Sequence, residues 1–155
     1  MEGDPIPDFE TEELKEKSLK ATESLYKQLI FDVEKFCAQN RKWAAIWFAI
    51  YVFIGLSAVL SSSVSAILTF LDLANSTLLF SVAFSSTASA YILTFLDPSS
   101  RASKRKAAAR KSASLIIKAK KEQAYVSVLA ASDSYKKISN LYDQFANLLE
   151  DSPEQ

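Results

Sequence analysis

"WAAIWFAIYVFIGLSAVLSSSVSAILTFLDLANSTLLFSVAFSSTASAYILTFL", residues 43–96, decides the fold of this 155-residue chain. The whole chain has 18 basic and 18 acidic residues, but this stretch has one charged residue, Asp72. A bilayer core of about 30 Å is crossed by about 20 helical residues, so the stretch is too long for one crossing. Asp, Asn and Ser at 72–76 favour a turn. We therefore predict spans over 43–71 and 77–96, joined by a short external loop over 72–76.

The hexapeptide "ILTFLD" occurs at 67–72 and again at 92–97. In the predicted hairpin each copy ends a span, and its aspartate is the first residue in water. The two copies then lie on opposite sides of the membrane and do not form one site. The repeat is compatible with a duplicated helix or with chance. The alternative, a hairpin buried in a soluble bundle, requires polar outer faces, and these helices offer only Ser and Thr.

Basic residues flank the two spans, and the loop has none. Because positively charged flanks stay in the cytoplasm, we predict an inner-membrane protein with both termini cytoplasmic. Aromatic residues at the start of the first span and the end of the second fit one interfacial belt. The basic residues predicted to set this topology and to meet lipid headgroups are Arg41, Lys42, Arg101, Lys104, Arg105, Lys106, Arg110 and Lys111. An anionic regulatory ligand is an alternative for the basic segment 101–121.

Hydroxyl side chains recur every four residues in both spans, which places them on one helix face. One interpretation is close helix packing, since small residues let helices approach and hydroxyls bond across the contact. The other is a polar lining of a water path in an oligomer. The absence of Asp, Glu, Lys and Arg within either span argues against ion-coupled transport. The pore-lining or helix-packing residues predicted here are Ser57, Ser61, Ser65, Thr69, Thr77, Ser81, Ser85 and Ser89.

Long helices are predicted on the cytoplasmic side of both spans. After an acidic tail over 1–9, apolar residues at spacings of three and four predict an amphipathic helix over 10–42. A basic and then heptad-patterned helix is predicted over 97–150, followed by a tail over 151–155. The fold class predicted is an all-α membrane protein whose cytoplasmic helices form a coiled-coil-like bundle. The predicted oligomerisation residues are Ile117, Ala124, Ala131, Ile138, Leu141, Phe145 and Leu148.

The composition argues against enzymatic and metal chemistry. The chain has no histidine, and Cys37 is its single cysteine. We therefore expect no catalytic residue, no cofactor and no metal site. No aromatic residue interleaves the basic segment, so no nucleic-acid partner is expected.

The sequence "FLDPSSRASKRKAAARKSASL", residues 95–115, resembles the stretch after the second span of SLATT-type two-transmembrane effector domains. Asp97, Pro98, Ser99 and Arg101 match the family's post-span motif. Departures occur at three positions, where relatives often have His, Gly and Tyr and this chain has Arg105, Ala109 and Ser112. The layout of an upstream helix, two close spans and a long cytoplasmic helix is also similar.

This resemblance implies a function that periodicity and spacing do not. It implies an oligomeric pore-forming or membrane-disrupting effector in bacterial antiviral defence. A separate sensor or nucleotide-signalling protein would trigger it. The alternative is a non-conducting membrane scaffold whose coiled coil recruits cytoplasmic partners.

Overall fold

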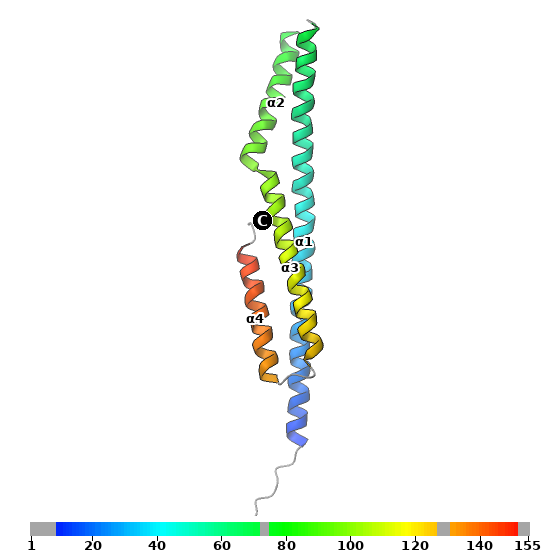
Figure 1. Cartoon of the computed structure of the whole chain (residues 1–155), viewed down its shortest axis with the longest axis vertical. Coiled ribbons are helices and arrows are strands. Elements are labelled where there is room, and N and C mark those ends of the chain that lie inside the picture. Colours follow the sequence, from blue (N-terminus) through cyan, green and yellow to red (C-terminus); the bar gives the residue numbers. More distant parts are fainter. Residues whose placement is uncertain (1–8, 72–74, 127–130, 152–155) are drawn as a thin grey trace, which may run out of the picture. The chain divides into compact units, whose positions relative to one another are not determined.

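The computed structural model describes residues 9–71, 75–126 and 131–151, and helices are its only regular elements. In chain order these are α1 (Phe9–Phe70), α2 (Ser76–Leu96), α3 (Pro98–Tyr125) and α4 (Ala131–Glu150), shown in Figure 1. The all-helical prediction is confirmed for this part of the chain. The predicted upstream helix and the predicted first span form one unbroken helix, α1. Most of the predicted loop, residues 72–74, and the tail residues 1–8 and 152–155 lie outside the described residues.

The prediction of a single helix over 97–150 is wrong, because α3 ends at Tyr125 and α4 begins at Ala131. The heptad pattern ran through this break and placed Ile117 in phase with Ile138. In the structure Ile138 is buried, whereas Ile117 is 70% exposed. The buried face of α3 follows Ser112, Leu115 and Ala119 instead, and Val126, directly after the helix, is also buried. From Val126 to Ile138 a continuous helix would turn by about 120° beyond whole turns, so one straight helix would not bury both faces.

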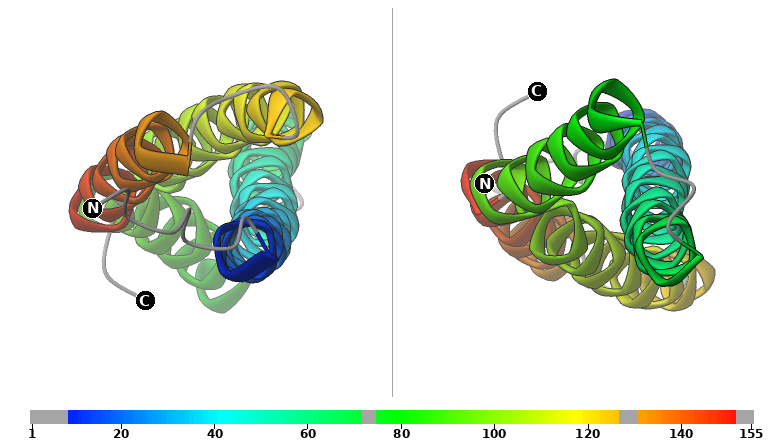
Figure 2. Two further views of the ribbon diagram at one scale, coloured as in Figure 1. Left: turned by 90° about the horizontal axis from the view of Figure 1, so that it is seen from below. Right: turned by 90° about the horizontal axis from the view of Figure 1, so that it is seen from above.

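The chain divides into two compact units, which we describe separately. The charged unit comprises Met1–Gln39 and Ala108–Gln155, and the apolar unit comprises Asn40–Ala107. In the charged unit, the first half of α1, the second half of α3 and all of α4 pack as three helices (Figure 2). Their shared core consists of Tyr26, Leu29, Ile30, Val33, Leu115, Ala119, Val126, Ile138 and Leu141.

Within the charged unit, α4 runs antiparallel to α3. The Lys137 ammonium lies 2.8 Å from Glu122, and Lys111 lies 3.4 Å from Asp151, so later positions of α4 meet earlier positions of α3. All four side chains are substantially exposed, and such ion pairs contribute little to stability. Burial of the amphipathic face of α4 therefore supplies most of the free energy that holds it in place.

Within the apolar unit, contacts link later positions of α1 to earlier positions of the following helices. Asn40 bonds Arg105, Trp47 meets Arg101, and Ser61 meets Ser85. Such a sequence of contacts is expected for antiparallel helices. The same unit contains most of the exposed large apolar side chains of α1 and all of those of α2.

Candidate functional site

Two helices are long and apolar enough, by length and composition, to cross a membrane. Their most apolar 18-residue windows are 0% and 6% buried, whereas the core helix of a soluble protein is mostly buried. Phe53, Phe70, Phe80 and Phe95 are each more than 70% exposed. A continuous apolar surface of this kind requires lipid or protein to cover it. Within this chain the apolar windows of the two helices are therefore not buried, as the alternative of a soluble bundle would require.

The hydroxyl positions of α1 lie on its better covered side. Ser57, Ser61 and Ser65 are half-buried, and Thr69 is exposed near the end of the helix. The Ser61 hydroxyl lies 3.4 Å from that of Ser85 on α2. Among the described residues, no other hydroxyl–hydroxyl hydrogen bond joins the two helices. The α1 ladder thus lies beside α2, in the position expected for helix packing.

The hydroxyl positions of α2 lie mostly on its uncovered side. Ser89 is buried, but Thr77, Ser81 and Ser85 are exposed. The better covered residues of α2 form a stripe that the ladder meets only at Ser89: Leu79, Val82, Ser86, Ala88, Ser89 and Leu93. The α1–α2 contact therefore leaves Thr77 and Ser81, the first half of the α2 ladder, available to another surface.

Half of the eight ladder hydroxyls donate a hydrogen bond within their own helix. Ser57 donates to the Phe53 carbonyl at 2.8 Å, Ser81 to Thr77 at 3.1 Å, and Thr69 to Ser65 at 2.9 Å. Such bonds satisfy the hydroxyl hydrogen without a partner helix, which makes serine tolerable in an apolar medium. The oxygen keeps acceptor capacity toward water or a neighbouring helix.

Asp97 forms the junction between α2 and α3. Its backbone is left-handed, with φ 38° and ψ 58°, which ends α2. Its carboxylate accepts bonds from the Ser100 amide at 3.2 Å and the Ser99 hydroxyl at 3.1 Å, so it caps the start of α3. Pro98 is the first residue of α3 and is buried. Proline suits that position because its fixed φ matches a helix and its missing N–H has no partner to lose.

The basic residues near this junction divide into two groups. Arg41, Lys42, Arg101, Lys104, Lys106, Arg110 and Lys111 are exposed, as headgroup contact would require. Arg105 departs from that prediction, because it is 7% exposed and its guanidinium donates to the Asn40 amide oxygen at 3.2 Å. Asn40 itself is 1% exposed. The buried stripe of α3 includes position 105, so this arginine packs against α1.

Arg101 takes a defined position on α1. Its guanidinium carbon lies 5.0 Å from the centre of the Trp47 ring, within cation–π range. The sequence indicated Arg101 as a headgroup residue and Trp47 as an interfacial aromatic, but it did not pair them. The pairs Trp47–Arg101 and Asn40–Arg105 depend on how α3 folds back on α1. Asn40 continues the apolar stripe through Val33 and Cys37, which was the one available sign that it faces inward.

The predicted oligomerisation residues fall into three classes. Ile138 and Leu141 are buried in the core of the charged unit, and Phe145 and Leu148 are partly buried against it. Ile117 and Ala124 are exposed. The side chain of Ala131 lies outside the described residues. Most of the α4 stripe is therefore used within one chain, where Phe145 packs edge-on against Phe36 with ring centres 5.8 Å apart.

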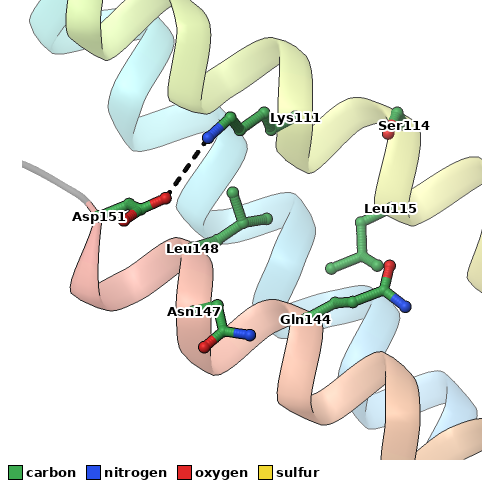
Figure 3. Close-up of a pocket in the computed structure, with 7 residues that line it drawn as sticks. All are labelled: Lys111, Ser114, Leu115, Gln144, Asn147, Leu148 and Asp151. Carbon is green, nitrogen blue, oxygen red and sulfur yellow. Dashed lines mark hydrogen bonds and ion pairs between the residues drawn. The ribbon is translucent and has the colours of Figure 1, made fainter.

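A pocket of about 250 Å³ lies along the seam of α3 and α4. Figure 3 shows Lys111 and Asp151 bridging one end of it, with Leu115 and Leu148 facing each other below. Ser114, Gln144 and Asn147 complete the lining. Its polar groups lie at the protein surface and are already hydrogen-bonded to water, so contact with them would add little to the binding free energy of a ligand. Among the described residues no three His, Cys, Asp or Glu side chains are grouped to hold a metal ion.

Comparison with known proteins gives no relative. No family model, no curated protein and no solved structure matches the chain.

Proposed function

We propose that this chain is a two-span membrane protein of the inner membrane, with a helical hairpin formed by residues 43–96 and both termini in the cytoplasm. The uncovered apolar surfaces of α1 and α2 support insertion. The exposed basic residues on either side of the two helices support the orientation, because such flanks remain cytoplasmic. The pairing of Trp47 with Arg101 places an aromatic and a cation together, as at a membrane interface.

In this proposal the protein is an oligomeric pore-forming or membrane-disrupting effector of antiviral defence. The observation that carries it is the exposed hydroxyl face of α2 at Thr77 and Ser81, for which the chain's own α1 offers no hydroxyl partner among the described residues. On this face the hydroxyls could bond to a second copy of the chain or to water in a pore. Contact with lipid acyl chains would leave them without such partners. The resemblance of residues 95–115 to SLATT-type domains supports the same function and a separate sensor as its trigger.

The second candidate is a non-conducting scaffold. The bonds that half of the ladder hydroxyls make to carbonyls of their own helix favour it, because such groups need no water path. Exposed Phe31, Ile117 and Tyr135 on the charged unit would then contact cytoplasmic partners.

Conductance across a planar bilayer distinguishes the two candidates. Purified full-length protein is added to one side, and single-channel current is recorded for the parent, Ser81→Phe and Ala83→Phe. Both positions are exposed, and two residues of helix separate their faces by about 200°. A pore lined by the hydroxyl face gives discrete steps that Ser81→Phe reduces and Ala83→Phe leaves intact.

Equal effects of the two variants would contradict a lining role for the hydroxyl face. A bilayer that stays silent with inserted parent protein would favour the scaffold. Ser61→Phe is unsuitable as the lining variant, because Ser61 touches Ser85 and the bulky ring would separate α1 from α2.

A further inference from the structure

The first turns of α3 combine positive charge with adjoining apolar surface. Asn40–Ala107 has six basic residues and two acidic ones, Asp72 and Asp97. The Asp97 carboxylate already accepts bonds from Ser99 and Ser100. Arg101 and Lys104 have no acidic partner among the described residues, and both are exposed. The charge here is not balanced within the chain.

Arg101 already contacts α1 in the absence of a ligand. Its guanidinium carbon lies 5.0 Å from the centre of the Trp47 ring on α1, and the exposed side chain keeps N–H donors that can bind a ligand. Lys104 lies three residues on, so the two cations are neighbours on one face of α3. Phe95 and Leu96, in the last turn of α2 before this segment, are exposed, as is Phe48, which follows Trp47 on α1.

We infer that Arg101 and Lys104 bind the phosphate of an anionic phospholipid whose acyl chains lie against the exposed apolar side chains of α1 and α2. The inference rests on the proposed membrane insertion and names a lipid partner for it. A phosphate accepts paired hydrogen bonds from a planar guanidinium, and a lysine adds a second charge. A ligand with one anionic end and one apolar end matches this combination of side chains.

Distance along α3 limits which cations take part. At 1.5 Å per residue, Arg101 and Lys104 lie about 6 and 10 Å beyond Asp97, whereas Lys118 and Lys121 lie about 32 and 36 Å beyond it. Charges interact over a Debye length of about 8 Å at physiological salt. Lys118 and Lys121 are also exposed and without an acidic partner among the described residues. They provide a matched control that removes equal charge from the same helix.

The chain contains its own reporter, since its two tryptophans are Trp43 and Trp47. The full-length protein in dodecyl maltoside micelles is titrated with phosphatidylglycerol that has dibrominated acyl chains, which quench tryptophan on contact. Phosphatidylcholine with the same chains serves as the reference lipid. The variants are Arg101→Gln/Lys104→Gln, the control Lys118→Gln/Lys121→Gln, and Arg101→Lys.

We expect the parent and the control pair to bind phosphatidylglycerol in preference to phosphatidylcholine. Arg101→Gln/Lys104→Gln should lose that preference by about tenfold, which corresponds to about 1.4 kcal/mol. Arg101→Lys should lose part of it, because it keeps the charge but not the planar fork over Trp47. Soluble glycerol phosphate should not compete, since it has no acyl chain.

Equal losses in both double variants would overturn the site in favour of diffuse attraction to a basic helix. An unchanged preference in Arg101→Gln/Lys104→Gln would also overturn it. Competition by soluble glycerol phosphate would identify free phosphate as the ligand and refute the lipid. Flotation of the protein with phosphatidylcholine liposomes tests insertion separately, so failure of the proposed function is distinguishable from failure of this inference.

Discussion

Replacing Ile138 by alanine should destabilise the charged unit far more than replacing Ile117 by alanine. The sequence places both isoleucines at the same heptad position, and a single coiled-coil helix would make them equivalent. In the structure Ile138 is 2% exposed and Ile117 is 70% exposed. The comparison therefore tests the break between α3 and α4 through two identical substitutions.

The expected size follows from burial. Isoleucine to alanine removes three carbons, and each buried methylene contributes about 0.8 kcal/mol, so transfer alone gives about 2.4 kcal/mol. The cavity left behind brings such losses to about 2–5 kcal/mol. At Ile117 most of the side chain is already in water, and surface substitutions change the free energy of unfolding by about 0.5 kcal/mol or less.

Chemical unfolding followed by circular dichroism measures this difference. The protein is kept in detergent, and size-exclusion chromatography establishes that the species compared is a monomer. Equal losses of the free energy of unfolding in the two variants would refute the assignment of Ile138 to the core and Ile117 to the surface. A large loss at Ile117 alone would support the heptad interface that the sequence predicted.

Three further predictions concern other parts of the fold. Ala109→Leu should lower the free energy of unfolding by about 1–3 kcal/mol, because Ala109 is buried and its carbonyl accepts a bond from the Cys37 thiol at 3.4 Å. The control Ala108→Leu, at a half-buried position, should lower it less when both variants are unfolded under the same conditions. Burial chiefly raises the pKa of the Tyr26 phenol above its usual 10, so the unfolded chain loses that proton first. The free energy of unfolding should thus fall as pH rises above about 10, and Tyr26→Phe should reduce that fall in a pH series. Asp97→Ala should speed hydrogen exchange at the Ser100 amide and lower the stability of the helix start by about 1–2 kcal/mol, because the capping carboxylate is lost. Asp97→Asn should keep both the cap and the left-handed backbone. Equal exchange rates in the two variants would contradict capping by Asp97.

The helical elements could be predicted with few errors because local signals define them. The charge-free stretch predicted the two apolar helices, and Asp97 with Pro98 predicted the boundary at which α3 begins. The break after Tyr125 could not be predicted, because the sequence has no glycine or proline there. The break depends on the apolar faces of α3 and α4, which point in different directions. A single heptad pattern run through both segments treats these two faces as one continuous stripe.

The candidate site was predictable in composition and not in arrangement. The four-residue spacing of the hydroxyls is visible in the sequence. Which of them are covered, mostly those of α1, and which are exposed, mostly those of α2, depends on how the two helices are rotated against each other. The same limit applies to the basic residues. Arg101 and Arg105 are one helical turn apart and alike in sequence context, yet one lies exposed against Trp47 and the other is buried against Asn40.

The sequence by itself determined that this protein is helical and that two of its helices are long and apolar enough to cross a membrane, because charge, hydropathy and capping act within a few residues of the chain. The tertiary structure decided which faces of those helices are covered, where the C-terminal segment folds back, and which cation meets which aromatic ring. Those outcomes depend on contacts between residues far apart in sequence, such as Trp47 with Arg101 and Tyr26 with the core around Ile138. The spacing of residues along one helix does not specify the rotation of its neighbour.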